Sequence, residues 1–145
     1  MNKYLLSAFF AAVGAQAPAC AQNYPSKPIR LIVPQPPGGG NDAIARMIGG
    51  KLSIALKQQV AVDNRSGAGG LIGADLAAKS PPDGYTLFLG NVATMAIVPN
   101  LQKKVPYDPL KDFAPVSLIA SAPLIVVVHP SLPVKTVKEL IALAK

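Results

Sequence analysis

The stretch IRLIVPQPPGGGND, residues 29–42, sets the architecture of this chain. It joins a short apolar run to an amphipathic segment, 43–56, through a loop rich in proline and glycine. This order is typical of a strand, a tight loop and a helix. Because three consecutive glycines carry no side chains, a ligand can approach the backbone N–H groups of the loop. Two interpretations stay open here: an anion site at the helix N-terminus, or a strand-to-helix turn without a ligand.

Asn41 and Asp42 suit the start of this helix, which we expect to run from about Asp42 to Leu56. Asn41 is expected to be the N-cap, and an acidic residue is favoured at the positive end of the helix dipole. Asp42 either stabilises the helix end or holds the N–H groups of the loop in place, since its charge would repel an anion. We interpret Gly49-Gly50 as a site of close packing on the sheet. The predicted buried stripe comprises Ile44, Met47, Ile48, Leu52, Ala55 and Leu56.

The chain continues with alternating apolar and amphipathic segments and short connections. Near-continuous apolar strands are typical of a parallel sheet, because helices cover both of its faces. Right-handed crossovers then predict an α/β fold with a parallel βαβαβ sheet. The predicted elements are strands at 29–33, 60–62 and 85–89, helices at 42–56 and 71–78, and a helical turn near 95–97.

A loop of small residues follows each predicted strand, at 34–41, 64–70 and 90–94. If the strand order is 2-1-3, the winding reverses between the first and third strands. Ligands of such sheets bind at the carboxyl ends of the strands, at the point of reversal. The three loops would then lie close together, and the sequence predicts a ligand site where they meet.

The first residues have the features of an export signal. Lys3 is followed by the apolar run 5–13, which is shorter than the roughly twenty residues that cross a bilayer. Ala19-Cys20-Ala21 fits the small-x-small pattern of a cleavage site. We therefore expect residues 1–21 to be a signal peptide that is removed before Gln22. Acylation of Cys20 is the alternative.

Composition argues against several classes of function. Cys20 is the only cysteine, so cleavage before Gln22 leaves no thiol for a disulfide, a zinc site or a nucleophile. The chain has 14 Lys and Arg against 7 Asp and Glu, but its basic residues are scattered and not interleaved with aromatic residues. Nucleic acid is therefore not an expected partner. The acidic residues lack metal-ligand spacing, and we expect no metal and no cofactor.

No catalytic constellation is recognised in the sequence. His129 is the only histidine, and we interpret it as a structural residue. Arg65 could pair with a ligand carboxylate, or form a salt bridge with Asp63 or Asp83. The glycines of the second loop do not match the spacing of a dinucleotide fingerprint, because Ile72 stands where glycine is required.

The last part of the sequence contains two apolar segments and a helix start. We expect 113–120 and 124–128 to be extended strands. Thr136-Val137-Lys138-Glu139 is a capping box that predicts a helix N-terminus. The sequence stops at Lys145 without a C-cap, and we expect the chain to be the front part of a longer protein.

Five motifs occur in order along the chain after the predicted signal peptide. They read YPSKPIR at 24–30, VPQPPGG at 33–39, NRSGAGG at 64–70, PDGYTL at 82–87 and PYDPLKDF at 106–113. Together they resemble the Bug family, the periplasmic solute-binding receptors of tripartite tricarboxylate transporters. The resemblance covers the chain from Tyr24 to its end.

The resemblance implies the first lobe of a type II periplasmic binding protein, with the second lobe largely missing from this chain. By position, 22–112 would form the first lobe, 113–128 the crossing or hinge strands, and 129–145 the start of the second lobe. The implied ligand is a small organic carboxylate: a dicarboxylate, tricarboxylate, amino acid or aromatic acid. The implied partners are the membrane subunits of the transporter. The ligand-binding residues carried over by position are Gly38, Gly39, Gly40, Asn41, Asp42, Ala68, Gly69, Gly70, Asn91 and Thr94.

Three residues depart from the family pattern. Gln35 stands where an aromatic residue is expected, Asn41 replaces threonine or serine, and Ser66 replaces proline. Gln35 adds a hydrogen-bonding group at the mouth of the implied cleft, so the identity of the acid stays open. Two alternatives to a working receptor are a truncated, non-functional fragment of one and a small exported α/β enzyme.

Overall fold

The computed structural model describes residues 24–123 and 125–145. The predicted signal peptide, its cleavage before Gln22, Cys20 and Leu124 lie outside the described residues. The chain divides into two compact units, Met1–Ala114 and Pro115–Lys145, and each is described by itself. Among the described residues, no helix combines the length and the apolar character that crossing a membrane requires.

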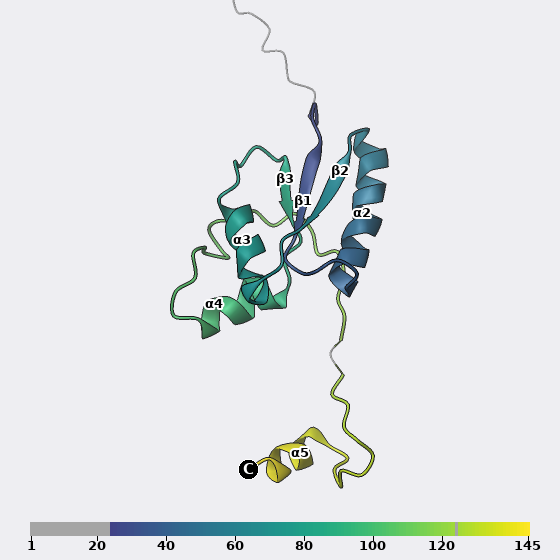
Figure 1. Cartoon of the computed structure of the whole chain (residues 1–145), viewed down its shortest axis with the longest axis vertical. Coiled ribbons are helices and arrows are strands. Elements are labelled where there is room, and N and C mark those ends of the chain that lie inside the picture. Colours follow the sequence, from purple (N-terminus) through teal and green to yellow (C-terminus); the bar gives the residue numbers. More distant parts are fainter. Residues whose placement is uncertain (1–23, 124) are drawn as a thin grey trace, which may run out of the picture. The chain divides into compact units, whose positions relative to one another are not determined.

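The first unit is built on a three-stranded parallel sheet with the order β2-β1-β3 (Figure 1). The strands are β1 (Ile29–Val33), β2 (Val60–Asn64) and β3 (Thr86–Phe88). The central strand β1 supplies four of the residues that form the buried core, which explains its near-continuous apolar sequence. The α/β class, the parallel sheet and the reversal between the first and third strands are all confirmed.

Two helices flank this sheet on its two sides (Figure 1). Helix α2 (Gly40–Leu56) packs on β1 and β2, and helix α3 (Leu71–Ala78) packs on β1 and β3. Both helices follow the predicted ranges to within two residues. The crossovers therefore leave the loops after the strands at one end of the sheet, as the sequence predicts.

The buried face of α2 differs from the predicted stripe. Asp42, Ala45 and Gly49 are its buried residues, whereas Met47 is 56% exposed. A β-carbon placed on Gly49 would lie 3.6 Å from methyl groups of Val60 and Val62, so the glycine lets the helix approach β2 closely. The helix turns its small residues toward the sheet, and of the predicted stripe Leu52 and Leu56 pack against the core while staying partly exposed. The helix continues through Gly49-Gly50, which confirms the packing interpretation.

The start of α2 also differs from the prediction. The helix begins at Gly40, and its N-cap is Gly39 rather than Asn41. Asn41 lies inside the first turn, where its side-chain amide donates to Gln35 Oε1 at 2.8 Å. The prediction of Asn41 as N-cap is therefore wrong, because a partner six residues back in the chain binds the amide.

The region after β3 is more helical than expected. A π-helical segment, η2 (Ala93–Ile97), continues into helix α4 (Val98–Leu101). The buried Tyr107 holds this segment in place, since its hydroxyl donates to the Thr94 carbonyl oxygen at 2.6 Å. Phe113 packs on Tyr107 with a centroid separation of 5.8 Å, so the chain up to Phe113 belongs to the first unit.

The second unit contains helix α5 (Val137–Leu143) and extended chain. The predicted capping box is confirmed: Glu139 N donates to Thr136 Oγ1 at 3.2 Å, and Thr136 N donates to Glu139 Oε2 at 3.3 Å. The predicted strands at 113–120 and 124–128 are wrong for the residues that are described, because none of these belongs to a sheet. An extended segment becomes a strand only when a neighbour accepts its hydrogen bonds, and no described segment does so.

Candidate functional site

The first two loops form two open hollows at the carboxyl ends of β1 and β2. The first hollow has a volume of about 560 Å³ and the second about 470 Å³. Gln35 and Pro36 line both hollows, so they lie between them. The remaining lining residues are Pro37, Gly38, Gly39, Gly40 and Asn41 in the first hollow, and Pro34, Ser66, Gly67, Gly69 and Gly70 in the second.

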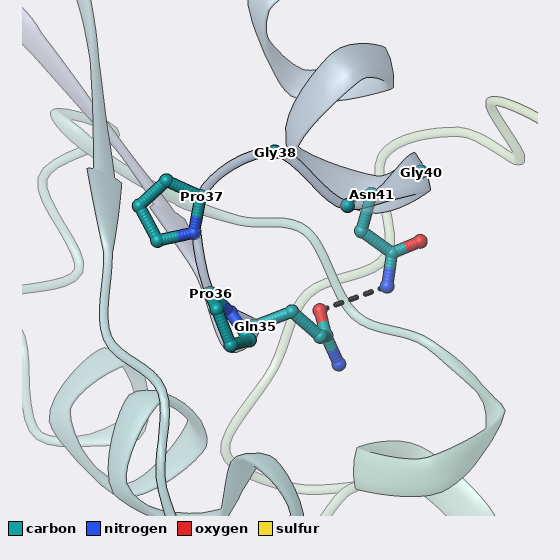
Figure 2. Close-up of a pocket in the computed structure, with 7 residues that line it drawn as sticks. Gln35, Pro36, Pro37, Gly38, Gly40 and Asn41 are labelled. Carbon is teal, nitrogen blue, oxygen red and sulfur yellow. Dashed lines mark hydrogen bonds between the residues drawn. The ribbon is translucent and has the colours of Figure 1, made fainter.

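The N-terminus of α2 forms part of the first hollow, as Figure 2 shows. The first N–H groups of a helix have no acceptor within the helix. The N-cap Gly39 has no side chain, and no side chain from the described residues caps this end. The unpaired N–H groups of the first turn and the positive end of the helix dipole thus lie at the edge of an open hollow. Such an arrangement suits a negatively charged group.

Asp42 holds the first loop in place through its carboxylate. Its carboxylate is buried, and it accepts hydrogen bonds from Arg46 Nε at 2.9 Å, Gly38 N at 2.9 Å and Asn64 Nδ2 at 3.0 Å. The hydrogen bond from Arg46, followed by that from the Gly38 N–H, lowers the pKa of Asp42 to about 2. Of the two roles considered for Asp42, holding the N–H groups of the loop matches this geometry.

The second hollow is bounded by a loop with an unusual backbone. Four consecutive residues, Gly67 to Gly70, have positive φ angles, including Ala68 at 47°. A β-carbon on Gly70 would lie 2.6 Å from Thr94 Cγ2 and 3.2 Å from Pro34 Cβ. Gly70 therefore lies against both the first and the third loop. The predicted meeting of the three loops at one end of the sheet is confirmed.

The third loop contributes to this end of the sheet without lining either hollow. Thr94 N donates to Asn91 Oδ1 at 3.0 Å, and Asn91 N donates to Thr94 Oγ1 at 3.2 Å. Thr94 is fully buried. Asn91 Oδ1 and the Thr94 hydroxyl are thus engaged within the loop, at the start of the helical segment that follows.

The ten residues predicted from the sequence fall into two groups. Six line a hollow: Gly38, Gly39, Gly40, Asn41, Gly69 and Gly70. Four line neither hollow: Asp42, Ala68, Asn91 and Thr94.

Sequence reasoning missed two residues that support the site, Arg46 and Asn64. Arg46 could have been found from its position four residues after Asp42 on the same helix, a spacing at which opposite charges meet. Asn64 gives no such signal, because it reaches Asp42 across 22 residues of sequence through the pairing of β2 with β1.

Arg65 is engaged in a salt bridge, as one of the sequence alternatives proposed. Its Nε lies 2.9 Å from Asp63 Oδ1, and Asp63 also pairs with Arg30. Asp83 pairs instead with Lys27, at 3.1 Å. Within the part of the chain that the structure describes, no group of three or more His, Cys, Asp or Glu side chains is arranged to hold a metal ion.

Comparisons with known proteins identify a family and several individual proteins that are similar to this chain. The family described as "Tripartite tricarboxylate transporter family receptor" matches residues 44–145. The chain is 44% identical over 142 residues to "Protein BugT" of Bordetella pertussis. This match covers 97% of the present chain and 44% of that protein. The chain thus spans less than half the length of this curated relative.

Solved structures agree with the sequence match. A structure titled as an R. palustris protein "with adipate" has a TM-score of 0.72 and 40% identity, and the match covers 83% of this chain and 40% of that one. "MatC" from Rhodopseudomonas palustris "with bound malate" has a TM-score of 0.64 and 36% identity. That match covers 66% of this chain and 33% of the other.

Proposed function

The chain belongs to the tripartite tricarboxylate transporter receptor family, and on this basis we propose that it is part of a receptor that captures a small organic carboxylate for such a transporter. The family is one of solute-binding receptors. We further propose that residues 1–21 direct export, that the receptor works in the periplasm, and that it delivers its solute to the membrane subunits of the transporter.

One observation carries the proposal: the uncapped N-terminus of α2 lines an open hollow formed by backbone and small residues. The first-turn N–H groups can donate to a carboxylate, and the helix dipole favours its charge. Gly69 and Gly70 line the second hollow nearby. We propose that the solute contacts the six predicted residues that are among those lining the hollows, while Asp42, Asn91 and Thr94 hold the loops in place.

Replacement of Gly39 by aspartate tests the proposal. Gly39 has an extended backbone, φ −82° and ψ 171°, and the atom nearest to an added β-carbon is the Pro36 carbonyl oxygen at 3.8 Å. An aspartate at the N-cap would accept hydrogen bonds from the free N–H groups of the first turn, and its charge would repel an anion. We expect Gly39→Asp to weaken binding of succinate or malate about tenfold or more, because a hydrogen bond to a charged group contributes about 1.5–3 kcal/mol.

The measurement is a titration of the ¹⁵N-labelled chain followed by NMR, which detects millimolar affinities. Gly39→Asn is the matched control, since it adds a side chain of the same size without charge and should weaken binding less. The free energy of unfolding should change by only a few tenths of a kcal/mol in either variant. Equal binding by Gly39→Asp and the unchanged chain would refute the proposed site.

A further inference from the structure

The amide side chains of Gln35 and Asn41 form a pair at the first hollow. Asn41 Nδ2 donates to Gln35 Oε1 at 2.8 Å, and Figure 2 shows the two side chains reaching toward each other from the two ends of the loop. Both residues line the first hollow, and both are only partly exposed. The pair therefore closes the loop with side chains rather than with backbone.

The pair keeps one donor and one acceptor for a solute. Gln35 Nε2 and Asn41 Oδ1 make no hydrogen bond to another described residue. If both amides were turned over, Asn41 would accept from Gln35 and the free groups would be Asn41 Nδ2 and Gln35 Oε1. Either orientation thus leaves one free NH₂ group and one free carbonyl oxygen.

The position of Gln35 brings the free group of its amide to a solute in either hollow. Gln35 lines both hollows, whereas Asn41 lines only the first. A solute whose carboxylate binds the N–H groups of α2 would cover the amide pair with its next carbon atoms. A hydroxyl group there can donate and accept, whereas a methylene group can do neither, so it displaces water from the amide groups without replacing the hydrogen bonds of that water.

We propose that the Gln35–Asn41 pair selects carboxylates that carry a hydroxyl group close to the carboxylate over their unsubstituted counterparts. This inference rests on the proposed function and narrows the class of solute. The preference expected is about threefold to tenfold, because one hydrogen bond contributes a net 0.5–1.5 kcal/mol.

The test compares malate with succinate, and lactate with propionate, since each pair differs by one hydroxyl group. The ¹⁵N-labelled chain is titrated with each acid and followed by NMR. We expect the hydroxylated acid to bind more tightly, and to shift the side-chain NH₂ signals of Gln35 or Asn41 more than its counterpart does. The double variant Gln35→Met/Asn41→Leu removes both amides from the first hollow, so the two acids of each pair should then bind with equal affinity.

Gln59→Met is the matched control, because Gln59 is exposed and precedes β2 at the opposite end of the strand from the hollows. This variant should keep the full preference. Equal affinities within each pair of acids, or a preference that the double variant Gln35→Met/Asn41→Leu retains, would overturn the inference and leave the proposed function standing. If none of the four acids shifts the NMR signals of any residue that lines the first or second hollow, the proposed function fails and the inference fails with it.

Discussion

Asp42 receives hydrogen bonds from a loop amide, from an arginine on its own helix and from an asparagine on β2. Asp42 thus connects the first loop, α2 and β2 at this end of the sheet. Because the carboxylate is the shared acceptor, the shape of the first hollow depends on its charge. The residue acts on the proposed site by holding Gly38, and its own charge is balanced by Arg46.

Replacement of Asp42 by asparagine should therefore destabilise the fold in a pH-dependent way. An asparagine has one acceptor oxygen for three donors, so one or more of Gly38 N–H, Arg46 and Asn64 would lose its partner. The pKa of Asp42 is lowered from 3.8 to about 2, so its contribution to stability is present above pH 4 and is lost as the pH falls toward 2.

Urea unfolding followed by circular dichroism measures this effect. At pH 7 the free energy of unfolding of Asp42→Asn should be lower than that of the unchanged chain, and the difference should shrink steadily between pH 4 and pH 2. The same pair of proteins at pH 2 is the control. A difference that stays constant across this range would show that the charge of Asp42 does not hold the loop.

At the scale of the elements, glycines decide how closely each helix approaches the sheet. A β-carbon on Gly73 of α3 would lie 2.7 Å from the Arg65 carbonyl oxygen and 3.0 Å from Pro34 Cα. Both are backbone atoms of the loops that line the hollows, so a side chain at Gly73 would push α3 away from them. Gly50 of α2, in contrast, has nothing within 4 Å of its β-carbon position.

The same substitution at these two helix positions should have opposite effects. Gly73→Ala is expected to lower the free energy of unfolding by about 1–3 kcal/mol, because the backbone must move to admit the methyl group. Gly50→Ala is expected to raise it by about 0.5–1 kcal/mol, because alanine favours a helix interior. Chemical denaturation of the two variants gives both values. Destabilisation by Gly50→Ala would mean that α2 is not exposed at that point.

At the scale of the whole molecule, the two hollows are open to water. A solute bound there keeps much of its hydration, and each hydrogen bond then contributes only about 0.5–1.5 kcal/mol. We therefore expect this chain by itself to bind carboxylates with dissociation constants well above the micromolar range. Isothermal titration calorimetry with malate, succinate and citrate measures this directly. Micromolar affinity for any of the three acids would contradict the expectation.

The second unit differs from the first in how its apolar side chains are placed. Val116, Leu118 and Ile125 are each more than 80% exposed, and α5 has no buried residue. Its apolar sequence predicts strands, yet a strand needs a neighbour to pair with. The division into a first lobe at 22–112, a crossing segment at 113–128 and the start of a second lobe at 129–145 stays a prediction.

Much of the first unit could be predicted from short stretches of sequence. The apolar run of β1, the glycines after it and the amphipathic segment that follows are local signals, and all three describe the structure correctly. The strand order and the meeting of the three loops also followed, because parallel strands and right-handed crossovers leave few arrangements. The capping box of α5 could also be predicted from the sequence, since its two residues lie only three positions apart.

Other features depend on contacts between residues that are distant in the sequence. The buried face of α2 is set by the fit of Gly49 against Val60 and Val62, and hydrophobic periodicity alone pointed to larger residues. Asn41 binds Gln35 instead of capping its helix. Local sequence was thus sufficient for the elements and their order, because these follow from backbone preferences and the burial of apolar runs. The tertiary structure alone settled which side chains hold the loops and which face the hollows, because those pairings form only once the strands have brought distant residues together.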